Sequence, residues 1–112
     1  MMEMGAGDAR ALDDRGLIRA LKALADPTRF RMVQEIAAAG ELSCGQVAEL
    51  FDVSQPTVSH HLNVLIEAGV LSVRIDGKHR YTSVNHPLVA SLARLLAARL
   101  GPRRERAPRA RA

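Results

Sequence analysis

A chain of 112 residues has the size of one domain, which argues against a separate catalytic domain, and its 3% aromatic content favours a mainly helical core of Leu, Val, Ile and Ala. The net charge of +4 belongs to residues 101–112, which hold five Arg and one Glu, because residues 1–100 hold 11 basic and 11 acidic residues. The body is therefore not globally basic, and a nucleic-acid-binding function has to rest on local motifs.

The sequence contains no apolar run of the roughly 18 to 20 residues that a membrane span requires, and its first residues lack the order of a signal peptide. Its single cysteine, Cys44, cannot form an internal disulfide, as is typical of a reducing compartment. We therefore expect a cytoplasmic protein with no membrane partner.

Helical periodicity begins after residues 1–12, which are predicted to be a mobile N-terminal arm. A first helix ends before Asp26-Pro27, and Pro27 suits the first turn of a second helix that runs to about Ala39 before Gly40. The residues expected to face inward on the first helix are Leu17, Ile18, Leu21 and Leu24. Those expected to face inward on the second are Phe30, Val33, Ile36 and Ala37.

Two further helices follow, joined by a tight turn at residues 52–53. Ser43 and Gln46 have the spacing of a capping box, which predicts the start of a third helix of about eight residues. Ser54 caps a fourth helix that has Pro56 in its first turn and ends at Gly69. The inward residues of these helices are expected to be Val47, Leu50, Phe51, Val58, Leu62, Leu65 and Ile66.

The pattern changes from helical spacing to alternation at Val70, which predicts a β-hairpin. Asp76-Gly77 is a strong turn signal between a strand of alternating residues 71–75 and a return strand at 80–84. A fifth helix with Leu88, Leu92, Leu95 and Leu96 precedes Gly101, and residues 101–112 are predicted to be a disordered basic tail. The order α-α-α-α-β-β-α over residues 13–100 predicts a mainly α fold with a small β-hairpin, a winged helix-turn-helix.

The outer face of the fourth helix is polar but uncharged, since no acid, Lys or Arg occurs between Val53 and Ile66. Amide and hydroxyl groups suit base edges: Gln and Asn can form two hydrogen bonds with adenine, while Ser and Thr bind bases or phosphates. The hairpin adds three basic residues against Asp76, which could hold phosphates. The predicted DNA-binding residues are Ser54, Gln55, Pro56, Thr57, Ser59, His60, Asn63, Arg74, Lys78 and Arg80.

Residues 21–84 resemble the ArsR/SmtB family of bacterial repressors. Four segments carry the resemblance, in the right order and spacing: LKALADPTRFRMV, GELSCGQVAEL, VSQPTVSHHLNVLIEAGVL and GKHRY. The resemblance implies a homodimer that is paired through its first and last helices, binds an inverted repeat in double-stranded promoter DNA and is released by an inducer. The predicted dimer interface consists of Leu17, Leu21, Leu88, Leu92, Leu95 and Leu96, a stripe that would otherwise be exposed.

Neither of the metal sites that the resemblance implies has its ligands in this sequence. The two cysteine positions of one site fall on Ser43 and Gly45, and a single thiol between them cannot hold a soft ion. The positions of the other site fall on Asn85, Pro87, Ala98 and Gly101, which are poor zinc ligands. We therefore predict no metal and no cofactor at these sites. A metal site of new geometry, using Cys44 and one of His60, His61, His79 or His86, stays open.

Four further features of the sequence each have two possible interpretations. Cys44 is either a redox sensor near a helix N-terminus or a small, half-buried residue after a cap. His60 and His61 point about 100° apart on a helix, and we assign His60 to the DNA groove and His61 to packing or a helix-end hydrogen bond. The leucine stripe of the last helix either forms a dimer or completes the core of one protomer. The basic tail either grips DNA or is solvated.

The function class expected from these patterns is a sequence-specific transcriptional repressor. The alternative is a winged-helix dimer that acts as an adaptor through protein contacts, which the neutral body of the chain favours. An enzyme is the least favoured class, because no Ser-His-acid set, phosphate-binding Gly loop or paired carboxylates are recognisable and no catalytic residue is predicted.

Overall fold

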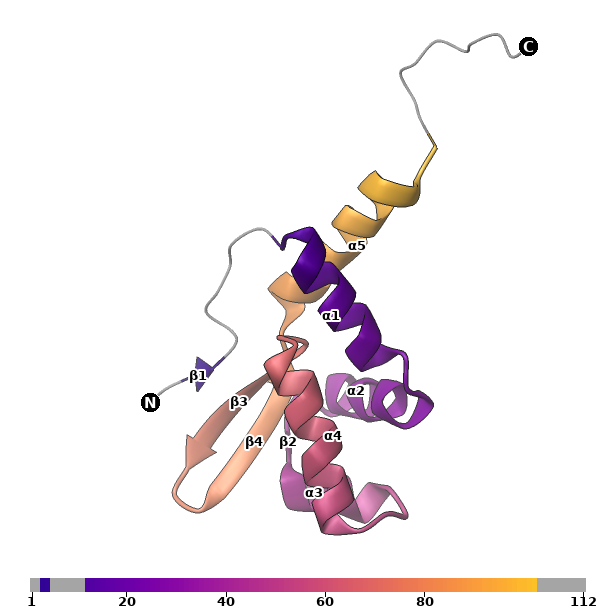
Figure 1. The fold of residues 1–112 in the computed structure, drawn as a ribbon. Coiled ribbons are helices and arrows are strands. Elements are labelled where there is room, and N and C mark those ends of the chain that lie inside the picture. The colour runs from indigo at the N-terminus through magenta and orange to yellow at the C-terminus, as the bar shows by residue number, and fades with distance from the viewer. Residues whose placement is uncertain (1–2, 5–11, 103–112) are drawn as a thin grey trace, which may run out of the picture.

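The computed structural model describes residues 3–4 and 12–102, in which five helices and four short strands occur (Figure 1). The helices are α1 (Asp14–Leu24), α2 (Pro27–Ala39), α3 (Cys44–Leu50), α4 (Gln55–Glu67) and α5 (His86–Leu100). The strands are β1 (Glu3–Met4), β2 (Leu42–Ser43), β3 (Leu71–Asp76) and β4 (His79–Val84). The winged helix-turn-helix order predicted from sequence is confirmed, and β1 and β2 are additions to it.

Side-chain caps fix where the helices begin. In each case an oxygen of the residue before the helix accepts a hydrogen bond from a backbone N–H three residues later, which satisfies one of the free donors of the first turn. The capping residues are Asp13, Asp26, Ser43, Ser54 and Asn85. The predicted caps at Ser43 and Ser54 are confirmed, including the reciprocal capping box between Ser43 and Gln46.

The core lies between α1, α2, α4 and the base of the hairpin. Its large, fully buried side chains come mainly from α2 and α4. The residues at the start of β3 pack against them. They include Met32, Ile36, Val47, Val58, Leu62, Leu65, Val70 and Leu71. The predicted inward face of α4 is confirmed at Val58, Leu62 and Leu65, while Ile66 is half-buried.

Four side chains predicted to face inward are exposed instead. Phe30 is 51% exposed and Ala37 is exposed, while α2 buries Met32 together with the predicted Ile36. Ile18 of α1 is 50% exposed, whereas Leu17, Ala20 and Ala23 are buried, and Leu50 of α3 is 52% exposed. The buried stripes of α1 and α2 are thus rotated from the predicted faces. Leucine spacing alone does not reveal this rotation.

The wing is the antiparallel pair β3–β4, in a sheet of order β1-β3-β4-β2. Leu71 pairs with Val84 and Asp76 with His79, so the return strand begins one residue before the predicted position. β2 pairs with β4 on one side, and β1 pairs with β3 on the other. The strand β1 lies within the segment predicted as a mobile arm. The rest of that arm, residues 1–2 and 5–11, and the tail residues 103–112 lie outside the described residues.

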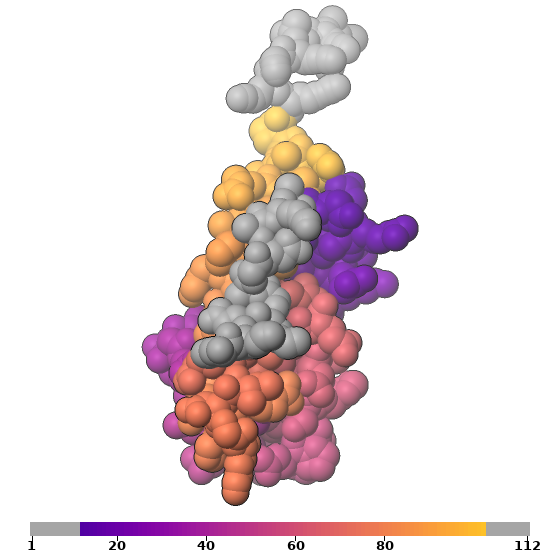
Figure 2. Space-filling view, turned by 90° about the vertical axis from the view of Figure 1, so that its left-hand side faces the viewer, coloured from indigo at the N-terminus to yellow at the C-terminus, as the bar shows by residue number. Residues whose placement is uncertain are grey.

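The wing and the N-terminal half of α4 share one end of the molecule, while the C-terminal half of α5 extends at the opposite end (Figures 1 and 2). A hydrogen bond at Asn85 stabilises the region between these two ends. The side-chain amide of Asn85 donates to the carbonyl of Gly69 at 2.9 Å. In the described part of the chain, no helix is both long and apolar enough to cross a membrane.

Gly69 and Gly40 provide a matched test of packing at the end of α4. Both have φ in the left-handed region, +86° and +88°, but a Cβ on Gly69 would lie 2.8 Å from Leu88 Cδ1, whereas one on Gly40 meets nothing within 4 Å. We expect Gly40→Ala to lower the free energy of unfolding by about 1 kcal/mol through backbone strain alone. We expect Gly69→Ala to cost about 1–2 kcal/mol more, because Leu88 must shift. Urea denaturation measures the free energy of unfolding of both variants. Equal losses would mean that the Leu88 side chain moves aside without cost.

Candidate nucleic-acid interface

The helix-turn-helix places α4 with one buried and one exposed face. Most of the residues predicted to contact DNA are exposed there, and Ser59 is half-buried: Ser54, Gln55, Pro56, Thr57, Ser59, His60 and Asn63. The Ser54 hydroxyl accepts from the Thr57 N–H at 3.3 Å and lies 3.0 Å from the Thr57 hydroxyl. These two hydroxyls therefore also hold the first turn of α4. The contacts of this face with bases stay a prediction.

The wing lies beside this face, and an open groove separates the two. The groove has a volume of about 430 Å³ and is lined by the start of α3 and its Glu49, by Gln55 and Ser59 of α4, and by residues 78–80 of the wing. The Arg80 side chain extends towards α4, where its Nη2 lies 3.4 Å from the Asn63 Oδ1. Lys78 is exposed at the hairpin turn. The groove thus combines uncharged polar groups from α4 with cations from the wing and one acid from α3.

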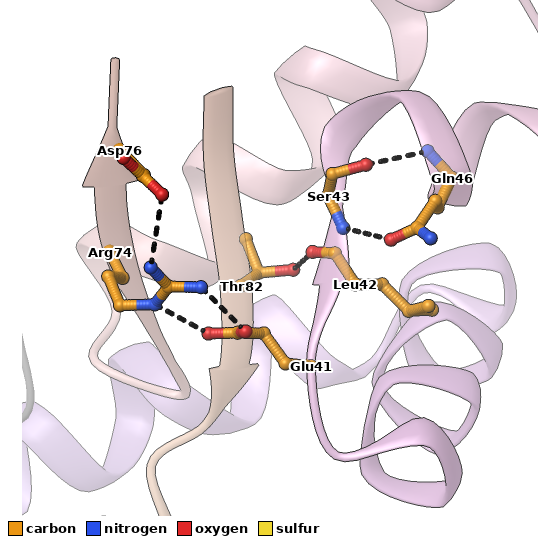
Figure 3. Close-up of polar contacts among 7 residues, drawn as sticks. All are labelled: Glu41, Leu42, Ser43, Gln46, Arg74, Asp76 and Thr82. Atoms are coloured by element: carbon orange, nitrogen blue, oxygen red, sulfur yellow. Dashed lines mark hydrogen bonds and ion pairs between the residues drawn. The ribbon is translucent and has the colours of Figure 1, made fainter. Parts of the chain in front are cut away.

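Arg74, the third predicted phosphate contact, is already paired. Its Nε donates to Glu41 Oε2 at 3.0 Å and its Nη2 to Glu41 Oε1 at 2.8 Å, a two-bond ion pair, while Asp76 lies 3.9 Å away (Figure 3). The guanidinium also lies over the Tyr81 ring at 4.5 Å. A phosphate would therefore compete with Glu41, 33 residues earlier in the sequence, for this guanidinium, and the role of Arg74 in DNA binding stays a prediction.

Short hydrogen bonds fix α3 against the wing. The Thr82 hydroxyl of β4 donates to the carbonyl of Leu42 at 3.0 Å, and the next residue, Ser43, exchanges bonds with Gln46 at 3.1 and 2.8 Å (Figure 3). The strand β2 therefore leads directly into the capping box of α3. This arrangement sets the start of α3 at a fixed distance from β4.

Removing the charge of Glu41 is expected to free Arg74 for DNA. We expect Glu41→Gln to raise affinity for random-sequence duplex and to steepen the slope of log affinity against log salt by about one, since one more phosphate is neutralised. Fluorescence anisotropy over a salt series measures this slope. Glu35→Gln is the control, because it removes the same charge from an exposed residue of α2. An unchanged slope in Glu41→Gln would show that Arg74 stays away from DNA.

The ion pair between Glu41 and Arg74 predicts that the stability of the fold depends on pH in the acid range. The hydrogen bond from Arg74 holds the pKa of the Glu41 carboxyl below its ordinary value and raises the pKa of the guanidinium. A carboxyl with a lowered pKa stabilises the folded state above its ordinary pKa, and this stabilisation is lost as the pH falls through the folded value. Carbon-detected NMR titration should place the midpoint of Glu41 below the usual range, and Arg74→Gln should return it upward.

The two histidines of α4 face different neighbours. His60 is exposed on the predicted DNA side, whereas His61 is half-buried and its Nδ1 lies 3.3 Å from Arg29 Nη1 of α2. The assignment of His61 to packing is confirmed, and the role of His60 in the groove stays a prediction. Sequence reasoning missed both Arg29 and Glu41, because each acts on a residue more than 30 positions away.

The residues at the expected metal-ligand positions, and Cys44 beside them, belong to the ends of helices. Cys44 is the first residue of α3 and is half-buried, Asn85 caps α5, and Gly101 follows its last turn. Within residues 3–4 and 12–102, no three His, Cys, Asp or Glu side chains gather in a way that could hold a metal ion.

The leucines predicted to form a dimer interface divide into two groups. Leu17 and Leu92 are only 6% and 7% exposed and belong to the core of the protomer, so they leave little surface for a partner. The other four are half-buried: Leu21, Leu88, Leu95 and Leu96. The large apolar side chains that these two helices leave most exposed are Ile18 and Leu100. α1 and α5 also share an ion pair, Arg99 with Asp14 at 2.8 Å.

Comparison with known proteins agrees with this geometry. A helix-turn-helix domain family matches residues 24–74, from the end of α1 into β3. The transcriptional repressor SdpR of Bacillus subtilis is 42% identical over 57% of this chain and 70% of that protein. The crystal structure of a possible transcriptional regulator for arsenical resistance superposes with a TM-score of 0.65 at 36% identity, covering 71% of this chain and 82% of the other. The chain belongs to the ArsR family of DNA-binding transcriptional repressors.

A more distant ArsR-type structure shares the fold alone. It is the homodimeric winged helix-turn-helix DNA-binding domain of a possible ArsR-family regulator from Mycobacterium bovis, with a TM-score of 0.62 at 20% identity, covering 82% of this chain and 86% of that one. The matched residues 24–74 contain α3, α4 and most of β3, so the family assignment covers the helix-turn-helix itself. α5 lies outside that match.

Proposed function

We propose that this ArsR-family repressor is a homodimer that recognises an inverted repeat in double-stranded promoter DNA and is released by an inducer. The observation that carries the proposal is the exposed, uncharged polar face of α4 beside the cationic side of the wing. Such a face forms hydrogen bonds with base edges in the major groove without adding charge, so it favours sequence recognition over general attraction to DNA.

The recognition contacts divide between the two elements. Gln55, Ser59 and Asn63 of α4 supply amide and hydroxyl groups for bases, while Lys78 and Arg80 of the wing supply charge for phosphates. Arg80 is close enough to Asn63 to orient its amide. Specificity then depends mainly on α4, and the salt-dependent part of the affinity depends on the wing.

A dimer is supported by the apolar side chains that α1 and α5 leave exposed, and by the homodimeric structure from Mycobacterium bovis with the same fold. Two-fold symmetry would place the two α4 helices about one turn of DNA apart, roughly 34 Å, and would match an inverted repeat.

The dimer can be tested without disturbing the core. We expect the double variant Ile18→Glu with Leu100→Glu to be a folded monomer in light scattering, because both side chains are exposed in the protomer and charge is not tolerated in an apolar interface. Ile75→Glu places the same charge on an exposed apolar residue of the wing and should remain a dimer. If the double variant Ile18→Glu with Leu100→Glu is still dimeric, the interface lies elsewhere.

Selection from a random duplex pool tests DNA recognition. The wild-type protein should enrich duplexes that share an inverted repeat, and binding to the enriched duplex should weaken steeply with salt. Enrichment of no sequence, together with undetectable binding at low salt, would favour the adaptor function instead.

A further inference from the structure

Arg29 joins three helices through one half-buried side chain. It lies in the first turn of α2, and its Nε donates to the carbonyl of Ala23 near the end of α1 at 2.7 Å. Its Nη1 lies 3.3 Å from the Nδ1 of His61 on α4, and its backbone N–H donates to Asp26 at 2.9 Å. Arg29 therefore bridges α1 and α4, two helices that also pack directly against each other.

The chemistry of this contact fixes its direction. A guanidinium can only donate hydrogen bonds, so the Nδ1 of His61 is the acceptor.

We propose that Arg29 is a positioning residue for DNA recognition, which holds α4 against α1 through its hydrogen bonds to the Ala23 carbonyl and to His61. This inference rests on the proposed function of α4. His61 directly follows His60 on the exposed face and precedes the core residue Leu62, so a shift at this point moves the recognition face relative to the rest of the protomer.

The test compares affinity for the duplex that the wild-type protein enriches from a random pool with affinity for a scrambled duplex of the same composition. Arg29→Lys keeps the charge, but one ammonium cannot serve both partners, so we expect specific affinity to fall about 10-fold with little change on scrambled DNA. Arg31→Lys is the matched control, because Arg31 lies over the Phe51 ring at 5.0 Å and does not bind α4 in the structure.

A pair of substitutions at His61 separates positioning from simple stability. His61→Asn offers an acceptor oxygen in place of Nδ1, so its ratio of specific to scrambled affinity should stay close to that of the wild-type protein. His61→Leu removes the acceptor, so its ratio should fall about as far as in Arg29→Lys.

Two results would overturn the inference: an unchanged ratio in Arg29→Lys, or an unchanged ratio in His61→Leu. Circular dichroism checks that each variant folds, and if Arg29→Lys unfolds, the comparison of His61→Leu with His61→Asn decides alone. Failure of the wild-type protein to enrich any duplex would count against the proposed function, whereas enrichment with unaffected variants would count only against the role of Arg29.

Discussion

Leu62→Ala is expected to lower the free energy of unfolding by about 3 kcal/mol, because it leaves a cavity beneath the recognition helix. Leu62 is 1% exposed and lies in the same core cluster as Met32 and Ile36 of α2. Small domains are commonly stable by only about 5–15 kcal/mol, so this loss would remove a large share of the total. Chemical denaturation followed by circular dichroism measures it.

Leu50→Ala is the control for this substitution. Leu50 has the same side chain and lies on the neighbouring helix α3, but it is 52% exposed, so its removal should cost about 1 kcal/mol or less. If both variants lost equal stability, the core would not be centred under α4 as the structure places it.

The double variant Gln55→Ala with Ser59→Ala is expected to reduce affinity for the enriched duplex by about 100-fold, since each good base contact contributes roughly 1–3 kcal/mol. Affinity for scrambled DNA should change by less than about threefold, because neither side chain is charged. The ratio of the two affinities, measured at one salt concentration, is the quantity to compare.

Lys78→Ala provides the contrasting pattern. Lys78 is an exposed cation at the wing turn, so its loss should weaken binding to both duplexes by a similar factor and reduce the salt slope by about one. Similar losses on both duplexes in the Gln55 and Ser59 variant would contradict base recognition by α4.

Local signals allowed much of this structure to be predicted from the sequence. The capping box at Ser43 and Gln46, the cap at Ser54 and the turn at Gly77 depend only on neighbouring residues, and all three lie where expected. The polar face of α4 could be predicted because a helix that buries Val58, Leu62 and Leu65 leaves the residues on its opposite face exposed.

Interactions between distant segments could not be predicted in the same way. The rotation of α2 that exposes Phe30 depends on what packs against it, and the pairing of Arg74 with Glu41 depends on where β2 meets the wing. The strand β2 has only two residues, too few for an alternating pattern to be recognised. For the same reason, the contact between Arg29 and His61 became visible only in the fold.

The pairing of β2 with β4 has a mechanical consequence. Ser43 belongs to β2 and is also the cap of α3, so the wing and the helix-turn-helix are connected through a single residue without a flexible linker. We therefore expect each protomer to present α3, α4 and the wing to DNA as one rigid body. A signal that releases the DNA would then act by changing the separation or tilt of two such bodies, and hydrogen exchange within each of them would stay unchanged.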